Sequence, residues 1–164
     1  IGLYYIRDVA ALWAGVEHTL ASPTNKGEYY LTDAFQHMID HGRKILAAEV
    51  AGWYDCGKLD TLLETNATLL ARGAARRRDF PGVQIQDPVY IEDGVTIERS
   101  SIGPNVSLEA GTHITDCAIS NAIIGRDVRI AHARLHGVML GDRAKVEGLS
   151  GTASLGEDSE VSAS

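Results

Sequence analysis

Residues 83–147 read VQIQDPVYIEDGVTIERSSIGPNVSLEAGTHITDCAISNAIIGRDVRIAHARLHGVMLGDRAKVE, and this stretch decides the fold of the chain. An Ile, Leu or Val anchor recurs there every five or six residues, and the residue two positions before each anchor is small or β-branched. A repeat this short suits a parallel β-helix, in which each short strand turns a corner and stacks on a strand of the next turn. Twelve pairs follow the pattern: Val83 and Ile85, Val89 and Ile91, Val95 and Ile97, Ser100 and Ile102, Val106 and Leu108, Thr112 and Ile114, Cys117 and Ile119, Ala122 and Ile124, Val128 and Ile130, Ala133 and Leu135, Val138 and Leu140, and Ala144 and Val146.

The repeat predicts that both members of each pair point into the β-helix. Twelve strands at three per turn make about four turns, and we expect residues 155–161 to add little to them. Glycines that directly follow an anchor, such as Gly103, Gly125 and Gly141, supply backbone freedom at the corners. The alternative is an antiparallel sandwich of short strands, whose strand and turn lengths vary more than they do here.

The first half of the chain predicts alternating strands and helices. Strands are expected at residues 2–6 and 44–50. Asp8 is expected to cap a helix that ends near Leu20, and Thr32 to cap a second helix that stops at Gly42. A third helix is expected from Leu62 to about Ala71.

So few strands make a poorly buried sheet, which leads us to expect a piece of a larger protein. The opening Ile-Gly-Leu-Tyr-Tyr-Ile also resembles the middle of a buried strand. We therefore predict that residues 1–71 are the C-terminal part of an α/β domain, residues 72–82 a linker, and residues 83–164 the β-helix.

Composition narrows the function classes. A net charge of -7 argues against nonspecific binding to nucleic acid or to an anionic membrane. The one basic run, Arg76-Arg77-Arg78, fits a solvated linker better than a phosphate-binding patch. Cys56 and Cys117 have no Cys or His at metal-ligand spacing, and no apolar run has the length of a membrane span. These features predict a cytoplasmic protein.

Each residue that could bind a metal or act in catalysis has two interpretations. Asp55 precedes Gly57 at the end of a predicted strand, where it can form a turn or bind a hard cation such as magnesium. His37 and His41 are four residues apart, a spacing that metals use, although a solvated helix face is the favoured interpretation. The histidines of the repeat can pack at the surface or serve as a general base in acyl transfer: His113, His132 and His136.

Three segments and the repeat together resemble a known family. GEYYLTD at 27–33, GWYDCG at 52–57 and LLETN at 62–66, followed by hexapeptides, resemble the C-terminal part of sugar-phosphate nucleotidyltransferases. The pattern is most similar to the long form of glucose-1-phosphate thymidylyltransferase, which carries a left-handed β-helix after its catalytic domain. The resemblance covers essentially the whole chain, and the handedness rests on the resemblance alone.

The resemblance implies a reaction and its participants. A nucleoside triphosphate, expected to be dTTP or UTP, and a sugar 1-phosphate, expected to be glucose 1-phosphate, give an NDP-sugar and pyrophosphate in nucleotide-sugar biosynthesis. By motif, Asp55 is similar to a Mg²⁺-binding aspartate of the family, while Gly2, Tyr4 and Trp53 resemble residues at the sugar-phosphate site. A homo-oligomer is implied, with neither a nucleic acid nor a membrane as partner.

Three functions stay open. The first is the tail of a nucleotidyltransferase whose β-helix builds an oligomer or a regulatory surface, and this is the function we favour. The second is a bifunctional enzyme whose β-helix acetylates an amino-sugar phosphate, and the third is a noncatalytic scaffold. The family's Gly-rich triphosphate loop, its lysine for the sugar phosphate and its first metal aspartate have no counterpart here. We therefore expect this chain alone to be inactive.

Overall fold

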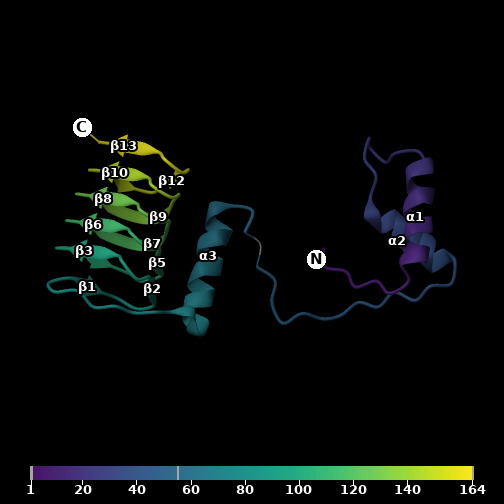
Figure 1. The fold of residues 1–164 in the computed structure, drawn as a ribbon, viewed down its shortest axis with the longest axis horizontal. Coiled ribbons are helices and arrows are strands. Elements are labelled where there is room, and N and C mark those ends of the chain that lie inside the picture. Colours follow the sequence, from purple (N-terminus) through teal and green to yellow (C-terminus); the bar gives the residue numbers. More distant parts are fainter. Residues whose placement is uncertain (1, 55, 164) are drawn as a thin grey trace. The chain divides into compact units, whose positions relative to one another are not determined.

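Two compact units make up the chain. The computed structural model describes residues 2–54 and 56–163, so Asp55 lies outside the described residues. The contacts divide the chain into Ile1–Trp53 and Tyr54–Ser164. Helices α1 and α2 belong to the first unit, and α3 and a stack of strands belong to the second (Figure 1). Each unit is described by itself below.

The second unit is a parallel β-helix, as the repeat predicted. All strand pairs in its sheets are parallel. The strands are β1 (Gln84–Ile85), β2 (Val89–Ile91), β3 (Thr96–Glu98), β4 (Ser101–Ile102), β5 (Val106–Leu108), β6 (His113–Thr115), β7 (Ala118–Ile124), β8 (Arg129–Ala131), β9 (Arg134–Leu140), β10 (Lys145–Glu147), β11 (Ser150–Gly151), β12 (Ser154–Leu155) and β13 (Glu160–Ser162).

The strands form three faces. The first face holds β1, β4, the beginnings of β7 and β9, and β11. The second face holds β2, β5, the ends of β7 and β9, and β12. The third face is the five-stranded sheet of β3, β6, β8, β10 and β13. Each face has five strands, so the β-helix has about five turns.

The fifth turn corrects the expectation of about four. Its anchor positions are taken by Gly151, Leu155 and Val161, which pair with Leu135, Leu140 and Val146 of the turn before. Gly151 lacks the aliphatic side chain that marks the other anchors, so the repeat is weak in sequence there. The backbone nevertheless continues the ladder, because strand pairing uses peptide groups and not side chains.

The apolar anchors form columns along the β-helix. On the third face, Ile97, Ile114, Ile130 and Val146 lie directly beside one another in register. All the predicted anchors are buried except Ile85 of the first turn, which is partly buried and packs against the same core. The predicted register of the repeat is therefore confirmed.

Left-handed backbone marks the corners. Arg99, Asp116, His132 and Gly148 have positive φ angles and recur every sixteen or seventeen residues, one per turn. Gly103 has φ 104°, and a Cβ built there would collide with the backbone oxygen of Gln86. That corner therefore needs glycine for its conformation and for space.

Helix α3 (Leu59–Leu69) covers the second face, beside the strands in Figure 1. Asn66 joins them: its amide donates to the backbone oxygen of Asn105 at 3.3 Å and accepts from the Ser107 hydroxyl at 2.6 Å. Leu63 and Leu70 are buried, Leu70 in a short π-helical turn, η1 (Leu70–Ala74). The contacts thus divide the chain at residue 53, earlier than the linker we predicted at residues 72–82.

The basic run Arg76–Arg78 lies against the first turn of the β-helix. The Arg76 N–H donates to Val89 at 2.8 Å, and its carbonyl accepts from Ile91 at 2.9 Å. All three guanidinium groups form ion pairs with nearby aspartates: Asp79, Asp87 and Asp93. This run is therefore neither a free patch for phosphate nor simply solvated.

The first unit holds α1 (Val9–Ala21) and α2 (Leu31–Asp40). Asp8 caps α1 as predicted, accepting from the Ala11 N–H at 3.0 Å. The cap expected at Thr32 is wrong, because α2 already begins at Leu31. Tyr30 is the residue before the helix, and its side chain forms no capping hydrogen bond. Gly42, with φ 77°, follows α2, and its N–H donates to Ile39 at 2.9 Å.

The strands predicted at residues 2–6 and 44–50 are absent from residues 2–54. These segments have no regular secondary structure and no neighbouring strand to pair with among the described residues, and a strand forms only when its peptide groups find partners. The two helices pack closely instead, since a Cβ on Gly15 would lie 2.6 Å from the Ala34 oxygen. In the part of the chain that the structure describes, every helix is too short or too polar to cross a membrane.

Replacing Ile102 with Asp tests the register of the core. Ile102 is fully buried in β4, so the carboxylate has no partner and we expect a loss of about 4 kcal/mol or more of unfolding free energy. The matched control is Ser101→Asp, where the adjacent side chain is exposed and little change is expected. Thermal melting followed by circular dichroism measures both, and equal melting temperatures would contradict the assigned register.

Candidate functional site

The predicted sugar-phosphate residues lie in the first unit. Gly2 is exposed and has open space around its Cα. Tyr4 is 51% exposed, and its ring packs on Phe35 of α2 with 4.7 Å between centroids. Trp53 is 64% exposed. Among the described residues, no side-chain hydrogen bond or ring contact joins Gly2, Tyr4 and Trp53 to one another, so their common role stays a prediction.

The predicted magnesium ligand, Asp55, lies outside the described residues. Within residues 2–54 and 56–163, His, Cys, Asp and Glu form no group of three or more that could hold a metal ion. A hard cation needs several oxygen ligands.

A stack of three imidazoles lies between α1 and α2. The ring of His37 lies 4.4 Å from that of His18 and 4.0 Å from that of His41. His41 Nδ1–H donates to the His37 carbonyl at 2.8 Å. The stack borders a hollow of about 290 Å³ whose lining includes Glu28, Asp33 and Asp40. The sequence indicated the His37 and His41 pair, but His18 joins it only through helix packing.

The stack lowers the pKa of His37. Desolvation is the largest cause, followed by the neighbouring imidazoles of His41 and His18, while Asp40 opposes them. Desolvation and the two neighbouring imidazoles each make a positive charge on His37 less favourable. His37 therefore stays neutral at pH values where an ordinary histidine begins to take up a proton.

Removing one ring tests this stack. We expect His41→Ala to raise the pKa of His37 toward its ordinary value, measured by NMR titration of the imidazole. Because the folded state binds this proton less readily than the unfolded state, the first unit should lose stability as pH falls through about 6.5 and below. His136→Ala, in the β-helix, is the control, and a His37 pKa unchanged by His41→Ala would contradict the interpretation.

The histidines of the repeat lie on the outside of the β-helix. His113 Nδ1 is 2.5 Å from the Thr96 hydroxyl, and His136 Nδ1 is 2.9 Å from the Ser120 hydroxyl. In both pairs the hydroxyl belongs to the preceding turn and fixes the orientation of the ring. His132 lies at a corner, 3.9 Å from carboxylates of Asp116 and Glu147.

The same corner contains a bidentate ion pair. Arg99 donates to both carboxylate oxygens of Asp116, at 2.8 and 3.0 Å. The hydrogen bond from Arg99 is the main cause that holds the pKa of Asp116 below its usual value. Asp116 therefore stays charged beside His132.

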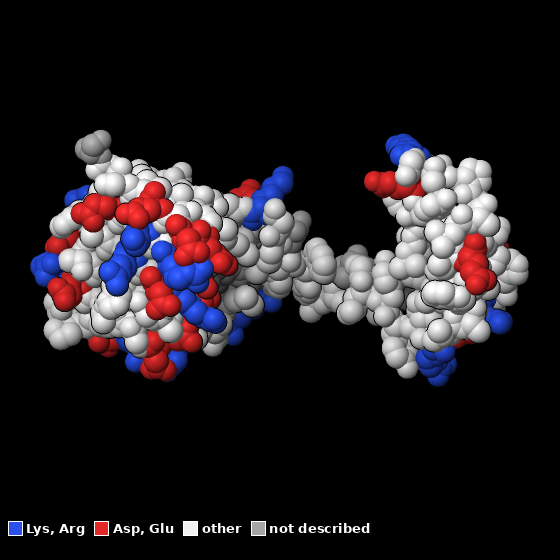
Figure 2. Space-filling model, turned by 45° about the horizontal axis from the view of Figure 1, so that its top comes forward, with Lys and Arg blue, Asp and Glu red and all other residues white. Residues whose placement is uncertain are grey.

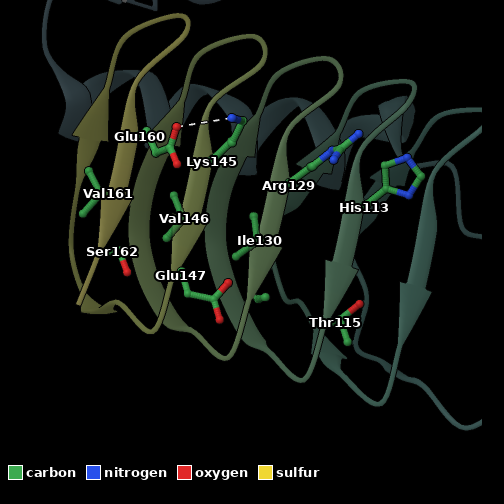
Figure 3. A pocket seen from close by; sticks show the side chains of 11 residues that line it. His113, Thr115, Arg129, Ile130, Lys145, Val146, Glu147, Glu160, Val161 and Ser162 are labelled. Atoms are coloured by element: carbon green, nitrogen blue, oxygen red, sulfur yellow. Dashed lines mark hydrogen bonds and ion pairs between the residues drawn. The ribbon is translucent and has the colours of Figure 1, made fainter. Parts of the chain in front are cut away.

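The third face carries a groove of about 650 Å³ that runs across its strands (Figure 3). One row of outward side chains borders it, formed by His113, Arg129, Lys145 and Glu160. The second row contains Thr115, Ala131, Glu147 and Ser162, and the strand backbone at Ile130 and Val146 forms the floor. Of the outward residues in the two rows, sequence reasoning noted only His113, because partners on successive strands are about sixteen residues apart.

Comparison with known proteins identifies relatives in two groups. The chain is 28% identical to glucose-1-phosphate thymidylyltransferase of Streptomyces griseus over 138 residues, 71% of this chain and 37% of that protein. It is 28% identical to the thymidylyltransferase of Streptomyces antibioticus over 166 aligned positions, 76% of this chain and 47% of that protein. It is 31% identical to the bifunctional protein GlmU of Levilactobacillus brevis over 164 positions, 96% of this chain and 32% of that protein.

These matches confirm the predicted resemblance: the chain is homologous to glucose-1-phosphate thymidylyltransferases and to the bifunctional protein GlmU. It spans about a third to a half of the length of these curated relatives. No protein-family model matches the chain.

Proposed function

We propose that this chain is the C-terminal portion of a sugar-1-phosphate nucleotidyltransferase that forms an NDP-sugar and pyrophosphate from a nucleoside triphosphate and a sugar 1-phosphate. The observation that carries the proposal is the homology to two thymidylyltransferases over about three quarters of the chain. Glucose 1-phosphate with dTTP or UTP is the proposed substrate pair. In this proposal the β-helix builds a homo-oligomer or a regulatory surface.

The surface of the first unit supports this proposal. Several large apolar side chains there are exposed, including Leu3 at 86%, Tyr5 at 88% and Trp13 at 63%. So much exposed apolar surface is unusual for a unit that functions alone, and it is typical of a surface that packs against further protein. In the proposed enzyme, the remaining part of the α/β domain covers these side chains and pairs with the segments at residues 2–6 and 44–50.

The proposed site residues keep the roles that the resemblance implies. Gly2, Tyr4 and Trp53 would line the sugar-phosphate site, where an exposed glycine leaves room for a ligand and aromatic rings can pack on a sugar. Asp55 would bind Mg²⁺ together with ligands outside the described residues. Bound Mg²⁺ offsets charge on phosphate groups.

Acetyl transfer by the β-helix is the second candidate function. Homology to GlmU, whose name describes a bifunctional protein, covers 96% of the chain and favours it. His136 beside the Ser120 hydroxyl provides a candidate general base on the first face. Turnover of acetyl-coenzyme A with an amino-sugar phosphate, assayed on the full-length protein, distinguishes this candidate from the first.

Pyrophosphate release tests the proposed function. We expect the full-length protein to release pyrophosphate from a sugar 1-phosphate and a nucleoside triphosphate, and the 164-residue chain alone to release none. If Asp55 binds the metal, Asp55→Asn lowers turnover about a hundredfold or more, equivalent to about 2.7 kcal/mol. The control is Asp60→Asn, since Asp60 is an exposed carboxylate whose side chain accepts from the Thr61 N–H.

Two outcomes would contradict these expectations. Magnesium-dependent pyrophosphate release by the chain alone would show that it holds a complete site. Unaltered turnover and magnesium dependence in full-length Asp55→Asn would leave Asp55 with the role of a turn residue, for which Asn is equally suited.

A further inference from the structure

The guanidinium of Arg129 forms no hydrogen bond or ion pair with any residue that the structure describes. This is unusual on the β-helix, where ion pairs engage the side chains of Arg99, Arg126, Arg143 and Lys145. Figure 2 shows the same mixing of acidic and basic side chains over the second unit. Arg134, on the first face, is the other strand arginine without a partner among the described residues. Arg129 differs from Arg134 because it borders the groove of the third face.

Other hydrogen-bond donors surround the same end of the groove. His113 lies next to Arg129 in the row, about 4.8 Å away along the β-helix. When the Thr96 hydroxyl donates to His113 Nδ1, the Nε2–H of the ring is left as a donor. The hydroxyl of Thr115 lies in the opposite row, and Ala131 beside it leaves space because its side chain is a single methyl group.

We propose that this end of the groove, between β6 and β8, binds the phosphate group of a small hydroxylated molecule. Guanidinium, imidazole and hydroxyl donors stand on two strands and in two rows, so they approach an anion from different sides. A tetrahedral phosphate can accept from all of them, and arginine favours it through paired charge-assisted hydrogen bonds.

The other end of the groove suits the rest of such a molecule. Glu147 follows Ala131 on the next strand, and Ser162 follows Glu147, so a carboxylate and a hydroxyl continue the same row. Lys145 and Glu160 are neighbours in the row that contains Arg129, and they form an ion pair at 3.2 Å (Figure 3). Carboxylates accept from hydroxyl groups and repel a second phosphate, which orients the ligand with its phosphate toward Arg129.

The groove is open to a ligand among the described residues. Helix α3 packs on the second face, so it leaves the third face uncovered within Tyr54–Ser164. Every residue of the proposed site belongs to the β-helix, and the site is therefore independent of the nucleotidyltransferase proposed above. Failure of either proposal leaves the other standing.

Phosphate titration of the 164-residue chain tests the site. We expect inorganic phosphate to cause saturable shifts in the imidazole NMR signals of His113 at constant ionic strength. Arg129→Ala should raise the dissociation constant tenfold or more, while Arg134→Ala should change it less than twofold. Arg134 is also exposed and has no partner among the described residues, but it lies away from the groove. Shifts of equal size with chloride, no saturation, or equal weakening by both variants would overturn the proposal.

A second variant separates the shape of the groove from its charge. Ala131→Leu fills the space beside Thr115 without changing any charge, and we expect it to weaken phosphate tenfold or more. Both groove variants should melt like the original chain, because both side chains point outward. Phosphate binding unaffected by Ala131→Leu would place the anion elsewhere.

A comparison of a hexose 6-phosphate with inorganic phosphate tests the contacts to the hydroxylated part of the ligand. A hexose 6-phosphate should bind at least tenfold more tightly than inorganic phosphate, and free hexose should cause no saturable shift. Equal affinities for hexose 6-phosphate and inorganic phosphate would contradict the proposed hydroxyl contacts at Glu147 and Ser162.

Discussion

In-register stacking of apolar side chains along the β-helix is the interaction on which the rest of the structure depends. Columns such as Ile91, Leu108, Ile124 and Leu140 are fully buried, and each member pairs with its counterpart one turn away. Burial of one such side chain contributes about 1.5–3 kcal/mol. Because the turns repeat in register, the outward side chains between the anchors also form columns.

That constraint gives each face a different use. The outward positions of the second face include Ile123 and Met139, which are half-buried, and α3 packs there. The third face instead carries charged and polar side chains in two rows, with a groove between them. Within these rows Lys145 and Glu160 form an ion pair between neighbouring turns, whereas Arg129 has no partner among the described residues. The same repeated backbone therefore supports a helix on one face and a candidate anion site on another.

The first unit depends on a different contact, the close packing of Gly15 against Ala34 that brings α1 and α2 together. This packing also brings His18 to His37 and lowers the pKa of His37. Yet, among its described residues, Met38 is the one large apolar side chain that the unit buries, while Leu3, Tyr5 and Trp13 are exposed. Its segments without regular secondary structure and its exposed apolar side chains are consistent with the homology to proteins two to three times as long.

The sequence by itself determined the β-helix, its register, the Asp8 cap and the end of α2 just before Gly42. Each of these follows from local periodicity or from the conformation of one residue. It predicted strands at residues 2–6 and 44–50 that the structure lacks, and it misplaced the start of α2, since strand pairing depends on neighbours and the α2 terminus has no side-chain cap to mark it. It also could not predict that α3 packs on the second face, or that His18, His37 and His41 stack. Only the tertiary structure decided those contacts. It also brought His113, Arg129 and Thr115 to one groove, because residues about sixteen positions apart become neighbours when the chain coils into successive turns.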